Sequence, residues 1–114
     1  MMLETVMQIN LGELTDVRVR SISGHERGLE ARRRFKLDDL DDCGGSVSVL
    51  VPDNIEAIAT SFFQGMFAKS VRRLGSKEKF LDHYHFVAHP FVVEQILRSV
   101  DRSLTRRSGA AFDH

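Results

Sequence analysis

The sequence has few of the features that assign a chain to a specialised class of protein. It contains one cysteine, Cys43, in 114 residues. A lone cysteine cannot form a disulfide within the chain, and so sparing a use is typical of a reducing compartment. No apolar run approaches the roughly 20 residues that cross a bilayer, and residues 1–6 lack the basic start of a secretion signal. These absences predict a cytoplasmic protein without a membrane segment.

The sequence also lacks a net charge. Sixteen basic residues balance sixteen acidic ones, so no global positive field would hold nucleic acid or an anionic membrane. The hydrophobic share of 42% and the charged share of 28% are ordinary for a globular protein. A chain of this length can bury one core of its own. We therefore expect a single domain over residues 1–107, followed by a flexible tail over residues 108–114.

Apolar patterns in the sequence predict the strands. Residues 7–11 and 17–22 alternate apolar and polar side chains, and the short turn between them predicts an antiparallel hairpin. Residues 46–51 end in a continuous apolar run, which is typical of a strand covered on both faces. Residues 84–88 form the last expected strand.

Helices are expected between and after these strands. The first covers residues 24–35, with Ser23 as its N-cap. The second covers residues 60–74, has one wide apolar face and is ended by a glycine. A short helix follows Ser76, and another spans residues 90–106. A strand, a helix and a second strand in sequence form a crossover connection, which implies parallel pairing of the later strands. The order predicts an α/β fold with a mixed sheet of about four strands, an N-terminal hairpin and about three to four packed helices.

The sequence gives no convincing metal, cofactor or catalytic site. Residues 37–45 hold four aspartates, but their spacing does not match a calcium-binding loop, so we expect a solvated loop. His83, His85 and His89 have no cysteine or carboxylate at zinc spacing and are interpreted as structural. Neither a nucleophile elbow nor a phosphate-cradling glycine loop is present. We expect no enzymatic activity, no metal and no cofactor.

Short motifs between Val47 and Val87 resemble the STAS superfamily, and more closely its STAS-like relatives of unknown function. The resemblance is carried by the following residues: the strand 47–51, Ile55-Glu-Ala-Ile58, Thr60-Ser61-Phe62, Leu74-Gly75, Phe80 and the strand 85–87. It implies a mixed sheet with helices packed on it and no enzymatic activity. It also implies a protein partner, such as an anti-sigma factor with the fold of a histidine-kinase-like ATPase.

The same resemblance points to the start of the second helix. STAS domains are often phosphorylated on a serine or threonine there, and that position falls on Thr60, with Ser61 next to it. Ala59, Gln64 and Gly65 stand where relatives often carry acidic residues. Independently of the family, the free N–H groups of a helix N-terminus accommodate a phosphate. The alternative is that Thr60 or Ser61 simply caps the helix.

Small residues line the opposite face of that helix from its phenylalanines. Ser61, Gly65, Ala68 and Arg72 follow one another at helical spacing. A glycine inside a helix costs about 1 kcal/mol relative to alanine, so a reason for Gly65 is expected. One explanation is close approach of a partner or of a second subunit in a homodimer. The other is a tight contact inside the domain.

The first helix offers a different candidate surface. Arg27, Arg32, Arg33 and Arg34 could form a basic patch for nucleic acid. Aromatic residues are scarce there and the net charge is zero, so a solvated face is favoured. The sequence therefore predicts a protein-interaction domain first. A nucleic-acid-binding module and a self-associating structural domain are the alternatives.

Overall fold

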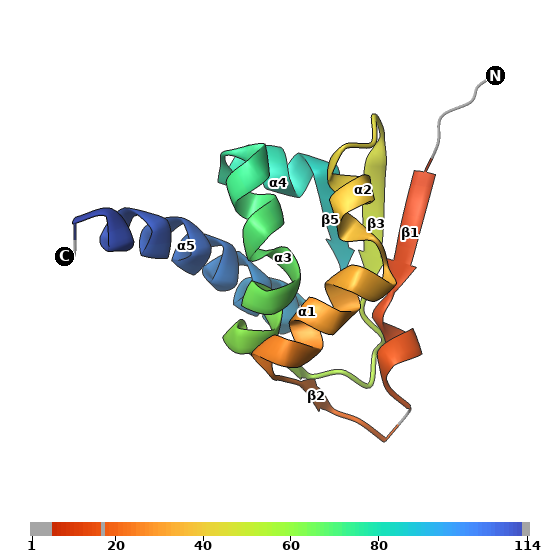
Figure 1. Cartoon of the computed structure of the whole chain (residues 1–114). Coiled ribbons are helices and arrows are strands. Elements are labelled where there is room, and N and C mark those ends of the chain that lie inside the picture. The colour runs from red at the N-terminus through yellow and green to blue at the C-terminus, as the bar shows by residue number, and fades with distance from the viewer. Residues whose placement is uncertain (1–5, 17, 113–114) are drawn as a thin grey trace.

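The computed structural model describes the backbone of residues 6–16 and 18–112, and the side chains of residues 7–16 and 18–105. This part of the chain contains both strands and helices (Figure 1). The strands are β1 (Val6–Asn10), β2 (Ser21–Ile22), β3 (Ser46–Leu50), β4 (Ala57–Ile58) and β5 (Tyr84–Val87). The helices are α1 (His25–Arg34), α2 (Leu37–Asp41), α3 (Thr60–Leu74), α4 (Lys77–His83) and α5 (Pro90–Phe112), and a 3-10 turn, η1, covers Leu11–Leu14. The expected α/β class is confirmed.

The described strands form two parallel sheets. The larger has the order β1-β3-β5, and the smaller pairs β2 with β4. In the larger sheet Ile9, Val49 and Phe86 lie side by side, and the first two are buried. The alternate positions, such as Gln8 and His85, are exposed. One face of the sheet therefore packs on the core. The other carries mostly polar side chains, together with the exposed Val87.

The predicted N-terminal hairpin and the mixed sheet are wrong. β1 pairs with β3, whereas β2 belongs to the second sheet, and every pairing among the described strands is parallel. The turn η1 separates β1 from β2: the Asn10 side chain accepts a 2.8 Å hydrogen bond from the Gly12 N–H, and Leu11 is buried. This turn carries the chain away from β1 instead of reversing it alongside.

The expected solvated loop after α1 is also wrong, because residues 37–41 form the short helix α2. Lys36 adopts the left-handed conformation (φ 56°) and turns the chain between the two helices. Leu37 is fully buried and Leu40 packs against the core. These two leucines hold α2 on the domain, and they bring Asp41 into the interior.

Helix α3 spans the residues that its apolar pattern predicts. Gly75 follows it with φ 94°, and its N–H bonds the carbonyl of Val71, as expected for a glycine that ends a helix. Phe67 is 2% exposed, and its ring contacts those of Phe63 and Tyr84 at centroid distances of 5.2 and 5.4 Å. The aromatic rings of α3, α4 and β5 thus form the centre of the core.

Two helix boundaries differ from expectation, and one agrees with it. Ser23 does not cap α1: Gly24 occupies the N-cap position, with φ 103° and no side-chain bond. Ser76 does cap α4, accepting a 3.1 Å hydrogen bond from the Lys79 N–H. α5 continues to Phe112, beyond its expected end at residue 106. Residues 113–114 of the expected tail lie outside the described residues, so the tail's flexibility stays a prediction.

Candidate functional site

Helix α3 begins without a side-chain cap. Its N-cap residue is Ala59, in an extended conformation, so neither Thr60 nor Ser61 fills the capping role. The Ser61 hydroxyl oxygen instead accepts a 3.2 Å hydrogen bond from the N–H of Gly24, which joins the starts of α1 and α3. The interpretation of Thr60 or Ser61 as a cap of α3 is therefore wrong. Among the described residues, no side chain forms a capping hydrogen bond at this helix start, so no side-chain oxygen offsets its partial positive charge.

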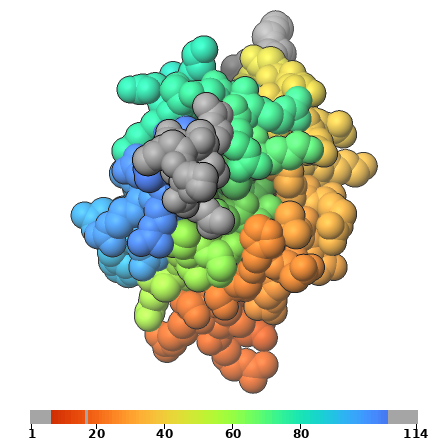
Figure 2. Space-filling view, turned by 60° about the vertical axis from the view of Figure 1, so that its left-hand side comes forward, coloured from red at the N-terminus to blue at the C-terminus, as the bar shows by residue number. Residues whose placement is uncertain are grey.

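A depression of about 330 Å³ lies beside this helix start. Its walls come from β2, β4, the first residue of α3 and the outer side of α5, which lie next to one another on the face shown in Figure 2. The polar side chains that line it are hydroxyls, one amide and two guanidinium groups: Ser21, Ser23, Thr60, Gln95, Arg98 and Arg102. The Gln95 Oε1 atom accepts a 2.9 Å hydrogen bond from the Ile58 N–H, which fixes α5 against β4.

The depression is electropositive. None of its lining residues is acidic, and Arg98 has only an exposed contact of 3.6 Å with Glu94. Arg102 makes no ion pair with any side chain that the structure describes. Two guanidinium groups, hydroxyl donors and a helix N-terminus together suit an anionic group such as a phosphate or a carboxylate.

The small face of α3 has a different role from its N-terminus. Gly65 is buried, and a side chain there would collide with the backbone carbonyl of His25 in α1. Gly28 meets Gly65 from the other side, with Phe62 O and Met66 N in the way of any Cβ. A tight contact inside the domain therefore explains Gly65, and it is not available to a partner. Ala68 is half-buried and Arg72 is exposed, and neither lines the depression.

The four arginines proposed as a basic patch on α1 are not all at the surface. Arg27, Arg33 and Arg34 are exposed, and Arg34 lies 3.5 Å from Glu13. Arg32 is buried and points into the domain. It cannot contact nucleic acid in this structure, so the four arginines do not form one surface.

Arg32 belongs to a buried polar cluster around Asp41, whose side chain is 1% exposed. One oxygen, Oδ1, accepts hydrogen bonds of 2.6 Å from the hydroxyls of both Ser70 and Tyr84. The other, Oδ2, lies 2.8 Å from Arg32 Nη2 and 3.4 Å from Arg73 Nη1. Every lone pair of the carboxylate faces a donor, which is the condition under which a buried charge is tolerated.

The cluster changes the acidity of two of its members. Burial, reinforced by the Asp41 carboxylate, raises the pKa of Tyr84 above its usual value of 10.0. The hydrogen bond from Arg32 lowers the pKa of Asp38 below 3.8. Sequence reasoning missed this cluster. Its available signals were Ser70 on the apolar face of α3 and the paired leucines 37 and 40, whose spacing is helical.

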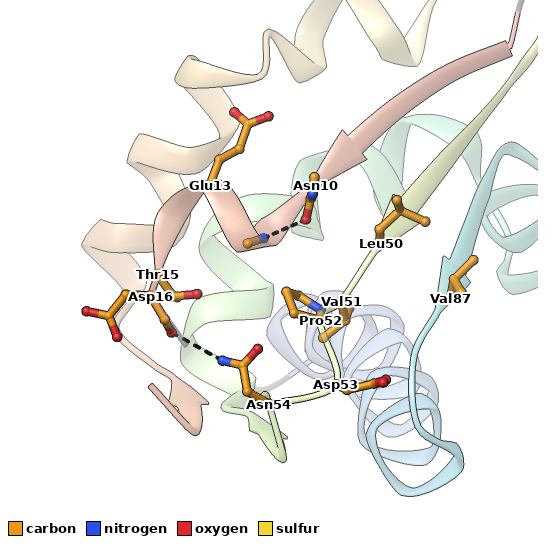
Figure 3. A pocket seen from close by; sticks show the side chains of 11 residues that line it. Asn10, Glu13, Thr15, Asp16, Leu50, Val51, Pro52, Asp53, Asn54 and Val87 are labelled. Atoms are coloured by element: carbon orange, nitrogen blue, oxygen red, sulfur yellow. Dashed lines mark hydrogen bonds between the residues drawn. The ribbon is translucent and has the colours of Figure 1, made fainter. Parts of the chain in front are cut away.

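A second hollow, of about 600 Å³, lies at the carboxyl ends of β1 and β3 (Figure 3). Ligands of parallel α/β sheets often bind at this edge. Its amide side chains, however, are bonded to the backbone. Asn10 accepts from the Gly12 N–H in its own turn, and Asn54 donates to the carbonyls of Asp16 and Val19 in the segment before β2. These contacts give both asparagines a structural role.

The histidines are engaged with the protein itself. His83 Nε2 lies 2.6 Å from the Leu40 carbonyl, His85 Nε2 lies 2.8 Å from the Asp82 carbonyl, and His89 stacks on Phe91. Across the described residues, no group of three or more histidine, cysteine or acidic side chains is arranged to hold a metal ion.

Within residues 6–16 and 18–112, no helix combines the length and apolar character that a membrane crossing requires. Comparison with protein-family models, with curated proteins and with solved structures finds no match to this chain.

Proposed function

We propose that the chain is a non-enzymatic, cytoplasmic interaction domain of the STAS-like type, which binds a protein partner through the depression at the start of α3. The observation that supports this proposal is the convergence of Thr60, Arg98 and Arg102 on one electropositive hollow at an uncapped helix end. The partner that fits is one that presents an anionic group there. A kinase-like ATPase is the partner class that the STAS-like sequence motifs imply.

Phosphorylation at this place would act as a switch. Thr60 is half-buried at the rim and Ser61 is exposed, so a kinase can reach the pair once it is docked. A phosphate on Thr60 adds about two negative charges next to Arg98 and Arg102. It would occupy the hollow from within and exclude the anionic group of the partner, so the complex would dissociate.

The first experiment identifies the partner by its position on the surface. A photo-crosslinking amino acid is placed at Arg102, in the depression, and at the exposed Lys79 of α4 as the control. Each variant is irradiated in cells, and crosslinked proteins are identified by mass spectrometry. We expect a kinase-like ATPase at Arg102 and not at Lys79. An equal yield at both positions would refute the docking site.

The second experiment uses the purified partner. Binding is measured by calorimetry for the wild type and for Arg98→Ala combined with Arg102→Ala. Arg33→Ala combined with Lys79→Ala removes the same two positive charges from exposed positions outside the depression and is the control. We expect the Arg98→Ala/Arg102→Ala variant to bind at least tenfold more weakly and the control to bind normally. Incubation with the partner and ATP should add phosphate to Thr60 or Ser61. If neither residue is phosphorylated in that reaction, the proposed switch is refuted. The docking site is then tested by the binding measurements alone.

A further inference from the structure

The outer edge of β1 has no strand beside it. β1 pairs with β3 along its whole length, from Val6 opposite Ser46 to Asn10 opposite Leu50. Among the described strands none pairs with its other side, and β1 forms the end of the sheet away from α3 and α5 in Figure 1. Gln8 and Asn10 are exposed, and Met7 is 37% exposed although it is apolar. The hairpin partner that the sequence suggests for this edge lies elsewhere.

This edge also lacks the usual protection against pairing. An edge strand presents unpaired N–H and C=O groups, and natural proteins shield such edges with lysine, proline, a bulge or a very short strand. The sequence of β1, Val-Met-Gln-Ile-Asn, holds no charge and no proline. Its register with β3 runs through five consecutive pairs without a bulge. The backbone of another strand can pair with such an edge.

We propose that β1 pairs with β1 of a second copy of this chain, antiparallel and about a two-fold axis. An uncharged strand is compatible with itself, and an antiparallel pair of identical strands is two-fold symmetric, as most protein dimers are. The two three-stranded sheets then become one continuous sheet across the dimer. This inference goes beyond the proposed function, since β1 contributes nothing to the depression beside α3.

The register follows from the strand bounds. Gln8 is the middle residue of β1, so full overlap of two copies places Gln8 opposite Gln8 of the partner subunit. Met7 then lies opposite Ile9 of the partner subunit. Both positions belong to the face that packs on the core, and an apolar pair across two strands stabilises the contact. This pairing covers the exposed Met7 side chain.

Light scattering tests the dimer and its location. The wild type should have about twice the 12.9 kDa mass of one chain at high concentration, and this mass should fall on dilution. Gln8→Lys places two like charges directly opposite each other, which destabilises the pair, so this variant should be monomeric. His85→Lys puts the same charge on the other edge strand, β5, and should stay dimeric. A monomeric wild type, or a dimeric Gln8→Lys, would overturn the proposal.

Disulfide trapping tests the register. Opposite residues of an antiparallel pair have Cα atoms about 4.5–5.5 Å apart, which a disulfide can bridge. In a Cys43→Ser background, Gln8→Cys should form a disulfide-linked dimer on mild oxidation, and His85→Cys should not. Circular dichroism confirms that each variant is folded. A crosslink that forms at His85→Cys and not at Gln8→Cys would refute the assignment to β1.

Discussion

The hydroxyl of Tyr84 donates a 2.6 Å hydrogen bond to Oδ1 of Asp41, and both residues are buried. The same oxygen receives the Ser70 hydroxyl, and the other oxygen receives Arg32. Helices α1, α2 and α3 and strand β5 therefore meet at one carboxylate. The interior of this small domain is organised by a polar group as well as by its aromatic rings.

Replacing Asp41 should be strongly destabilising. Asp41→Asn leaves the Arg32 guanidinium buried beside a neutral amide, with Asp38 as its remaining anionic contact. Breaking a buried ion pair in this way typically costs about 3–5 kcal/mol of unfolding free energy. Urea unfolding followed by circular dichroism measures the loss. Asp39→Asn, at an exposed position of the same helix, is the control and should change stability by less than about 0.5 kcal/mol. Equal stability of both variants would contradict the role of the cluster.

The raised pKa of Tyr84 predicts how stability changes at alkaline pH. The folded protein keeps the phenol protonated above pH 10.0, whereas the unfolded chain releases the proton there. The contribution of the Tyr84 phenol to stability is therefore fully present below about pH 10, and it is lost as the pH rises further. Tyr84 is the sole tyrosine in the sequence, so the absorbance of tyrosinate reports on it alone. We expect ionisation to coincide with unfolding and to be reversible on lowering the pH.

A matched variant separates this effect from general alkaline unfolding. Tyr84→Phe removes the phenol, so its stability should decline less steeply between pH 10 and the alkaline midpoint, although it starts from a lower value because Asp41 loses a donor. Ionisation of Tyr84 at its ordinary pKa in the folded wild type would show that the hydroxyl is accessible to water.

The contact between α1 and α3 predicts an unusual response to alanine. In an open helix, replacing glycine by alanine stabilises by about 1 kcal/mol. At Gly65 the added methyl group would meet the His25 carbonyl and the Leu29 N–H, so α1 must move away. We expect Gly65→Ala to lower the unfolding free energy by about 1–3 kcal/mol. Gly44→Ala, where a methyl group meets nothing within 4 Å, should be close to neutral. A stabilised Gly65→Ala would disprove the close approach of the helices.

The aromatic core gives a further quantitative prediction. Phe67 is 2% exposed, and Phe67→Ala should cost about 3–5 kcal/mol in unfolding free energy. Phe91 is 49% exposed, so Phe91→Ala should cost less than about 1 kcal/mol. The unfolding free energy of both variants is measured in guanidinium chloride. Because both replace phenylalanine by alanine, the difference reports on burial. A similar cost at both positions would mean that α3 is oriented differently.

The parts of the fold that sequence predicts well are those set by neighbours along the chain. The spacing of Phe63, Met66, Phe67 and Val71 defines the buried face of α3, and Gly75 and Ser76 end one helix and begin the next. Those signals are local, and each element agrees with the structure. The α/β class follows from the order of these elements.

Strand pairing and buried charge depend on residues far apart. The expected parallel pairing of the later strands is confirmed for β3 and β5, but the hairpin and the solvated loop are wrong. The alternation in residues 7–11 and 17–22 indicates strands, but it does not show which strand pairs with each. From sequence, the two segments are expected to pair with each other, whereas β1 pairs with β3 and β2 pairs with β4. Four aspartates among the nine residues 37–45 indicate a solvated loop. Only the structure shows that donors from other elements surround one of them, Asp41. The reason for Gly65 required the position of Gly28.

The Asp41 cluster also has a consequence for the order in which the chain folds. It joins residues separated by 9, 29 and 43 positions, so three loops must close before the carboxylate has all its donors. A partly folded state with α1 and α2 alone would hold Asp41 without the hydroxyls of Ser70 and Tyr84. We expect such a state to be poorly populated, because its buried carboxylate lacks two donors. We therefore expect the amides of α2, although it is five residues long, to exchange with deuterium through global unfolding and not through local fraying.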